Sequence, residues 1–157
     1  MIPPGGVARR QTDAAPTAPV ETGWASSACT GPAKASALFR SYNGTVAQAE
    51  ASVIAMTAPA TRFVTYADQN TGVAWANPSP NSASVTFTAN SLIGAGVGSN
   101  TITVTPGSHG SASLGPFLGI SAFQGSITIT SSQPIISLSL DAEAPPIFSA
   151  LPPGQDP

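Results

Sequence analysis

The stretch Gly125 to Leu140, GSITITSSQPIISLSL, decides the fold that we expect for this chain. Serine or threonine alternates with isoleucine from 126 to 130, and with isoleucine or leucine from 136 to 140. Because successive side chains of a strand point to opposite faces, each arm has one apolar face and one face of hydroxyl groups. Pro134 has no N–H to donate, which suits a connection. We therefore expect two strands that turn back on one another as neighbours in an antiparallel sheet.

Similar alternation, bounded by turn-forming residues, recurs earlier in the chain. It predicts strands at residues 38–42, 62–66, 73–76, 84–88 and 101–105. The polar segment 68–72 predicts a turn, and the glycine-rich segment 92–98 a loose loop. The segment 114–119, LGPFLG, is expected to form a helical turn that lays Phe117 and Leu118 over the open end of the core.

A hairpin is expected from residue 36 to residue 56. Asn43-Gly44 suits the positive φ angles of a type I′ turn between two strands. The return arm, residues 46–56, alternates as a strand does, but its alanines and a second apolar spacing also fit an amphipathic helix. The Asn-Gly turn favours the strand. Asn43-Gly44-Thr45 is also a formal glycosylation sequence, for which the turn is the simpler explanation.

About eight or nine short strands with little helix predict an all-β fold, an antiparallel β-sandwich of an immunoglobulin-like or jelly-roll-like kind. We assign residues 36–144 to this domain. Residues 1–35 are expected to form an extended N-terminal arm, and residues 145–157 a Pro-rich tail. Residues 1–25 contain no apolar segment of the secretory type. We therefore expect that a leader has been left out or that the chain is a piece of a longer precursor.

Charged residues are unusually few. They make up 8% of the 157 residues, against about 25% in an average soluble domain, and none lies between Asp68 and Asp141. Five Lys and Arg residues with a net charge of −2 do not neutralise a phosphate backbone, so nucleic acid is excluded as a partner. No apolar run is long enough to span a membrane. A surface of hydroxyl groups offers little repulsion between copies, which favours association.

The sequence offers no pattern for catalysis. His109 is the one histidine, and a Ser-His-acid relay would need a nearby carboxylate and a Gly-x-Ser-x-Gly elbow that the chain lacks. We expect His109 to be a turn residue. No two acids are framed by aromatic residues as a glycosidase site requires. The acids are Asp13, Glu21, Glu50, Asp68, Asp141, Glu143 and Asp156.

Metal sites are not expected either. The segment that begins at Asp68 has a weak similarity to a calcium-binding loop. Its glycine comes one position early and no distal Glu follows, so a turn is favoured. One histidine and one cysteine are too few for a zinc site. We predict no enzymatic activity, no cofactor, and no catalytic, cofactor-binding or metal-binding residue.

Cys29, the one cysteine, cannot form an internal disulfide, and we expect it to be partly buried. A disulfide between chains or a reactive thiol are the alternatives. Trp24, Trp75, Tyr42 and Tyr66 are the residues that a carbohydrate-binding surface would use. Core packing is the simpler expectation for Trp75, and Trp24 is a candidate anchor for the N-terminal arm.

Four short motifs add a resemblance. They are GVAWANP at 72–78, TFT at 86–88, PGSH at 106–109 and FQGSITI at 123–129. In this order they, and the alternation after Pro134, resemble a β-sandwich module of large secreted and surface proteins of environmental bacteria. The similarity runs from Gly72 to Leu140, about half the chain. That module has no assigned enzymatic activity, so the resemblance implies an extracellular, structural or adhesive role.

Two functions follow as hypotheses. The first is a non-enzymatic extracellular structural protein, a self-assembling subunit of a surface filament or similar polymer held by exchange of arms or strands between copies. The alternative is an adhesive or carbohydrate-binding β-sandwich module of a larger secreted protein. The expected partner is another copy of the chain in the first case, and a surface glycan in the second.

Overall fold

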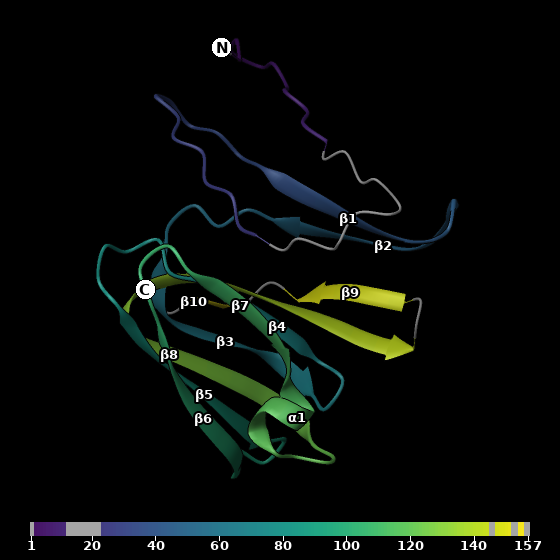
Figure 1. The fold of residues 1–157 in the computed structure, drawn as a ribbon, viewed down its shortest axis with the longest axis vertical. Coiled ribbons are helices and arrows are strands. Elements are labelled where there is room, and N and C mark those ends of the chain that lie inside the picture. The colour runs from purple at the N-terminus through teal and green to yellow at the C-terminus, as the bar shows by residue number, and fades with distance from the viewer. Residues whose placement is uncertain (1, 12–22, 145–146, 152–153, 156–157) are drawn as a thin grey trace.

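The computed structural model describes residues 2–11, 23–144, 147–151 and 154–155 (Figure 1). These residues form ten strands and one short helix, and all strand pairs are antiparallel, so the predicted all-β fold is confirmed. The elements are β1 (Ser36–Asn43), β2 (Val46–Ile54), β3 (Ala60–Asp68), β4 (Gly72–Ala76), β5 (Ala83–Ser91), β6 (Gly96–Val104), β7 (His109–Ser113), α1 (Leu114–Leu118), β8 (Gln124–Ala144), β9 (Ile147–Leu151) and β10 (Gly154–Gln155).

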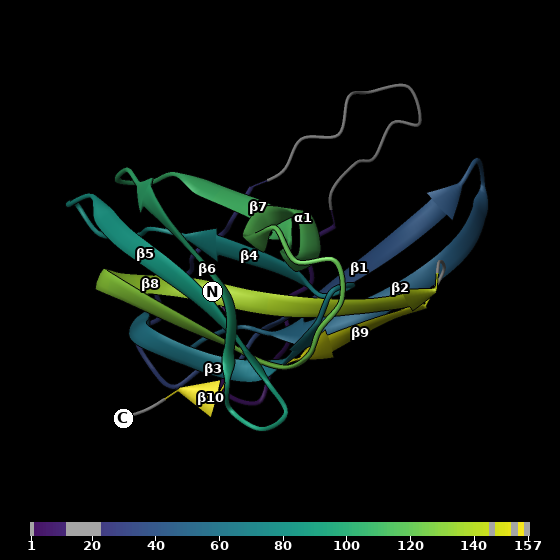
Figure 2. The same ribbon diagram turned by 90° about the horizontal axis from the view of Figure 1, so that it is seen from below.

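The long strand β8 organises the body of the molecule. Its first half lies between β3 and β5, with β10 outside β3 and β6 outside β5. Its second half lies between β4 and β9, with β7 outside β4. We call the first group of strands sheet 1 and the second group sheet 2. Figure 2 shows β8 crossing from one group to the other.

The expected turn at Pro134 is absent, and the prediction of a hairpin there is wrong. β8 is one strand of 21 residues. On β3, Arg62 pairs with Thr130 and Ala60 pairs with Ile135, so residues 131–134 bulge out of the ladder with β3. On the other side Ser131 still pairs with Val85 of β5, and the ladder with β5 ends there, before Pro134. A bulge bends a strand and tolerates a proline, because the inserted residues have no partner. The two alternating arms therefore continue in one direction and pair with different neighbours.

The two faces of β8 are also inverted after the bulge. Ser137 and Ser139 are buried, with 6% and 1% of their surface exposed, whereas the apolar residues at 136, 138 and 140 are half-buried on the outer face. The inner position suits small side chains because Ser137 lies opposite the large Trp75 on β4. The Ser137 hydroxyl donates to the Ala74 carbonyl at 2.9 Å, which satisfies it. The expected hydroxyl face of this half therefore points into the molecule.

Buried side chains from strands of both sheets form the core. An aromatic cluster packs at its edge, where the rings of Trp75 and Phe117, both partly buried, and of the fully buried Phe87 lie 5.1–5.7 Å apart. Both Phe117 and Leu118 of α1 pack against the buried residues, as predicted from the segment LGPFLG. The fully or largely buried apolar residues around them are Phe63, Ala67, Val73, Ala83, Val85, Phe87, Ala89, Val104, Leu114, Phe123, Ile127, Ile129 and Ile135.

Gly110 on β7 gives a first test of this packing. It pairs with Trp75, and a Cβ at Gly110 would lie 2.8 Å from the indole ring. We expect Gly110→Ala to lower the free energy of unfolding by about 1–3 kcal/mol, because the ring must move within a packed core. Urea unfolding followed by Trp75 fluorescence, with Trp24→Phe in the background, measures this. Gly72→Ala is the control, because its Cβ would meet its nearest atom at 3.7 Å. An equal loss in both variants would contradict the steric explanation.

The predicted hairpin of β1 and β2 is confirmed, and the helical alternative for its return arm is wrong. Its turn differs in detail. Asn43 pairs with Val46 as the last residue of β1, so the loop residues are Gly44 and Thr45. Gly44 has φ +59°, and among the residues that the structure describes only glycines have positive φ. Glycine at the first loop position is the requirement of a type II′ turn, not of the type I′ turn that we expected.

Described residues of the N-terminal arm and of the C-terminal tail contact the body. The indole N–H of Trp24 donates to the Gly107 carbonyl at 3.0 Å, so Trp24 anchors this part of the N-terminal arm. At the other end, β9 pairs with β8 and β10 with β3, so the expected tail adds a short strand to each sheet. The part of the chain that the structure describes has no helix long and apolar enough to cross a membrane.

Candidate functional site

Among the side chains that the structure describes, the residues considered for catalysis do not come together. His109 is exposed at the start of β7, opposite Ala76. Asp141 lies beyond Leu140, which pairs with Gly72 at the other end of β4. Four further acids have side chains that lie outside the described part of the structure: Asp13, Glu21, Glu143 and Asp156. His109 and Asp141 therefore occupy opposite ends of sheet 2.

Asp68 forms the turn that the sequence predicts between β3 and β4. Its Oδ1 accepts a hydrogen bond from the Asn70 N–H at 2.7 Å and one from the Thr71 hydroxyl at 3.3 Å. Thr71 is fully buried, and its Oγ1 accepts from the Asp68 N–H at 2.9 Å. The Asp68 carboxylate thus stabilises its own turn. Across the described ranges, no three His, Cys, Asp or Glu residues are grouped in a way that could hold a metal ion.

Cys29 is exposed, so the expectation that it is partly buried is wrong. Its neighbours in the arm, residues 25–35, are exposed as well, because this stretch has no apolar periodicity with which to pack. The closest polar neighbour is the Ser27 hydroxyl, at 3.8 Å from Sγ.

The four aromatic residues considered for carbohydrate binding lie in four different places. Trp75 is partly buried and packs against the core, in line with the simpler expectation of core packing. Trp24 is half-buried against the turn at Gly107. Tyr42 is on the hairpin and Tyr66 on sheet 1, with 54% and 41% of their surface exposed. They do not form one binding surface.

A shallow depression of about 440 Å³ lies beside α1. It is lined by Gln69, Gly115, Pro116, Gly119, Ile120 and Ser121. None of these side chains can act as an acid, a base or a nucleophile with an activating partner, and Gln69 already accepts a hydrogen bond from the Phe123 N–H at 3.2 Å. The depression therefore has no groups for chemistry.

Two surfaces of the molecule are distinctive. The first is the hairpin surface, which we define as the exposed apolar residues of β1, β2 and their ends. These are Leu38 (57% exposed), Phe39 (48%), Tyr42 (54%), Val46 (60%) and Ile54 (78%). The hairpin forms its own two-stranded sheet, with β2 beside β9 (Figure 1). Leu38 and Ile54 lie on one face of this two-stranded sheet and Phe39 on the other, so both faces of the hairpin expose large apolar side chains. An element exposed in this way is typical of a contact element.

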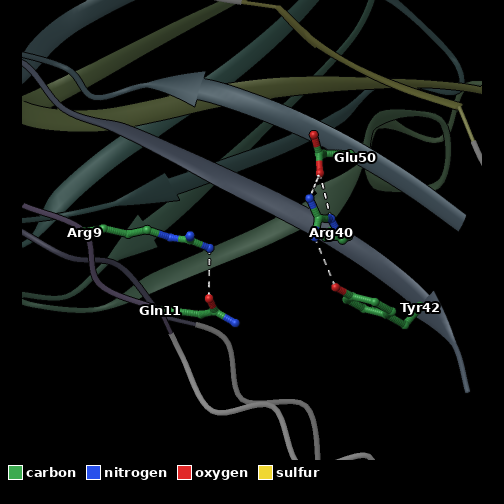
Figure 3. Close-up of polar contacts among 5 residues, drawn as sticks. All are labelled: Arg9, Gln11, Arg40, Tyr42 and Glu50. Atoms are coloured by element: carbon green, nitrogen blue, oxygen red, sulfur yellow. Dashed lines mark hydrogen bonds and ion pairs between the residues drawn. The ribbon is translucent and has the colours of Figure 1, made fainter. Parts of the chain in front are cut away.

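Polar contacts hold the two strands of the hairpin together (Figure 3). The Arg40 guanidinium donates to the Glu50 carboxylate across the strands, with Nε at 2.7 Å from Oε2, and to the Tyr42 hydroxyl at 3.5 Å. The hydrogen bond with Tyr42 and the ion pair with Glu50 raise the pKa of Arg40 above its ordinary value. Both charged side chains are 46% exposed, so the pair contributes little stability. Figure 3 also shows the Arg9–Gln11 contact of the arm.

The second surface is the outer face of sheet 1, which we call the hydroxyl face. Its residues alternate with the core residues of the same strands. Three rows cross the strands: Tyr66, Ser126 and Asn90; Val64, Thr128, Thr88 and Ser99; and Arg62, Thr130, Thr86 and Thr101. Hydroxyl pairs link β5 to β6, at 2.9 Å between Thr86 and Thr101 and 3.3 Å between Thr88 and Ser99. The alternation in residues 84–88, 101–105 and 126–130 predicted this face.

The fold thus presents an apolar hairpin and a neutral hydroxyl face, and no assembled catalytic group among the described side chains. The module-like motifs of residues 72–129 are turns and strand entries that many β proteins share, so the resemblance stays a prediction. Comparisons with protein-family models, with curated proteins and with solved structures find no match to this chain.

Proposed function

We propose that this chain is a non-enzymatic extracellular structural protein, a self-assembling subunit of a surface filament or similar polymer. The observation that carries the proposal is the hairpin surface, where five large apolar side chains are each at least 48% exposed. These residues belong to an element that shares no strand pairing with the eight-stranded sheet.

The energetics of the hairpin favour a partner. A two-stranded hairpin alone is marginally stable in water. Burying one large apolar side chain contributes about 1.5–3 kcal/mol, so five exposed ones represent a substantial gain on association. Within the residues that the structure describes, β1 pairs with β2 on one side and with no strand on the other. Its outer edge therefore offers backbone N–H and C=O groups for another strand.

A second copy is the partner that we propose for this edge. The body from residue 69 to residue 140 carries no charge, so copies do not repel one another across it. The tail strands β9 and β10 add to sheet edges within one chain, and the same additions between chains would be strand exchange. A contact between two different surfaces repeats without closing and builds a filament.

Light scattering of the purified chain tests this proposal. We expect the full chain to form large particles, and the double variant Leu38→Ser/Phe39→Ser to shift towards the mass of a monomer. The matched control is Leu92→Ser/Ile93→Ser, because these residues, 70% and 90% exposed, lie in the turn between β5 and β6. The control should assemble as the unchanged chain does.

Either of two results would overturn the proposal. One is a monomeric full chain at every concentration that keeps it in solution. The other is equal dissociation by the hairpin variant and the control variant, which would show that exposed apolar residues promote association in general. Extracellular placement would be contradicted if the chain, expressed in full in its own cell, stayed in the cytoplasmic fraction.

A further inference from the structure

The hydroxyl face is a regular array. Adjacent strands lie about 4.8 Å apart, and residues two apart on one strand lie roughly 7 Å apart, so the three rows form a grid of polar groups. The rows run over β3, β8, β5 and β6. Within the described part of the chain, the side chains of Ser126, Thr128 and Asn90 form no hydrogen bond with other residues. These donors and acceptors are therefore available to a ligand.

Tyr66 stands at one corner of the grid. It lies opposite Ser126, which lies opposite Asn90, so an aromatic ring, a hydroxyl and an amide share one row and one face. The Gln124 side chain donates to the Tyr66 hydroxyl at 2.8 Å, and this hydrogen bond restricts the orientation of the Tyr66 ring. With 41% of its surface exposed, Tyr66 is the exposed aromatic residue of the body as the structure describes it.

We propose that the hydroxyl face binds a neutral polysaccharide, with the Tyr66 ring stacked on a sugar and Ser126, Asn90 and the threonine rows bonded to its hydroxyl groups. Sugars combine an apolar C–H face, which packs on an aromatic ring, with many hydroxyl groups that donate and accept. A fixed ring beside an amide and several hydroxyls matches both features. This inference does not depend on self-assembly.

The chemistry of the face favours this class of ligand over others. A charged polymer needs opposite charges, and Arg62 at the far row is the one charged residue among the three rows. A protein partner would need an apolar centre with a polar rim, whereas the centre of this face is threonine. The other exposed aromatic residues that the structure describes, Phe39 and Tyr42, lie on the hairpin and have no hydroxyl rows beside them.

Co-sedimentation of the full chain with insoluble cellulose, chitin, β-1,3-glucan and starch tests the proposal, with a polymer-free sample to subtract self-association. We expect retention on at least one of these polymers, unchanged in 1 M NaCl because the contacts are uncharged. Tyr66→Ala should weaken it at least about tenfold, as loss of a central aromatic contact does. Tyr66→Phe should stay within about threefold, because the hydroxyl faces Gln124 and the ring carries the stacking.

Three further variants sharpen the test. Thr88→Val and Thr128→Val keep the shape and the strand preference and remove one hydroxyl each, and each should weaken retention about two- to tenfold. Tyr42→Ala is the matched control and should change retention less than about twofold. The proposal is overturned if no neutral polymer retains the chain, if Tyr66→Ala binds as the unchanged chain does, or if Tyr42→Ala loses as much.

Discussion

Replacing Gly125 by alanine is expected to lower the free energy of unfolding by about 4 kcal/mol or more. A Cβ at this position would lie 2.0 Å from the Asn90 carbonyl oxygen and 2.6 Å from the Ser91 carbonyl carbon. Both atoms belong to the backbone of β5, which pairs with β8 at this point. Since backbone atoms cannot rotate away as a side chain does, the two strands would have to separate. Urea unfolding of the full chain measures the loss.

Gly96→Ala is the matched control for this prediction. Gly96 also lies in a strand of sheet 1, but a Cβ there meets nothing within 4 Å. Its replacement should change stability by less than about 1 kcal/mol, with a gain as the expected sign, because alanine restricts the unfolded chain more than glycine does. A Gly125→Ala variant as stable as Gly96→Ala would show that β5 and β8 do not approach as closely as described.

Replacing Asn77 by leucine is expected to cost about 3–5 kcal/mol. Asn77 is fully buried after β4, and its Nδ2 donates to the carbonyl oxygens of Asn81 at 2.8 Å and Val104 at 2.9 Å. Its Oδ1 accepts from the Ser79 N–H at 2.9 Å. Leucine would remove the side-chain partner of three backbone groups, of which the Val104 carbonyl is buried and the other two are partly buried. Thermal or urea unfolding at neutral pH measures this cost.

Asn77→Asp adds a pH dependence to the same test. The carboxyl group would face two carbonyl oxygens in a buried place, and both burial and these oxygens raise its pKa in the folded state. Below the unfolded pKa of about 3.9 both states are protonated, and the variant has its highest stability. As pH rises from there, the free energy of unfolding should fall by about 1.4 kcal/mol per unit until the folded pKa is reached.

Asn81→Asp supplies the control for this pH dependence. Asn81 is exposed in the same turn, so its charged form stays solvated and stability should change by less than about 0.5 kcal/mol across the same pH range. A flat profile for Asn77→Asp as well would mean that water reaches this side chain, and would contradict its role as the link between the turns at 77–81 and 105–108.

Most strands could be predicted because their alternation is local. Val85 and Phe87 point inward and Thr86 and Thr88 outward, as the pattern of residues 84–88 requires. The hydroxyl face follows from this alternation directly. The sequence also predicted that Trp75, Phe117 and Leu118 pack against the core. Burial of a large apolar side chain contributes more free energy than burial of the small side chains around it.

The features that the sequence did not reveal depend on long-range pairing. A proline between two alternating arms indicates a break, but whether the chain reverses or bulges there depends on which strands lie beside each arm. Ser137 and Ser139 face inward because of their partners on β4, which no local pattern shows. β7, reading HGSAS, has almost no apolar residue and is a strand because Gly110 lies against Trp75.

The candidate site was only partly visible in the sequence. The alternation indicated hydroxyl faces, and Tyr66 was one of four aromatic residues considered, but nothing local separated it from Trp75. What distinguishes Tyr66 is its position in the alternation of β3. Phe63 and Ala67 point into the core, so Tyr66, an odd number of residues from each, points to the outer face. The exposure of Cys29 was missed because cysteine is usually buried, and the arm that carries it has no core to enter.

The bulged strand β8 determines which parts of the molecule unfold together. One continuous backbone supplies the middle strand of both layers, so neither layer can open and leave the other intact. Amide hydrogens on either side of residues 131–134 should exchange with solvent deuterium in one shared global event. The hairpin should exchange earlier, as a separate unit. A protease cut within 131–134 would break the backbone that joins the two sheets, which should then open separately.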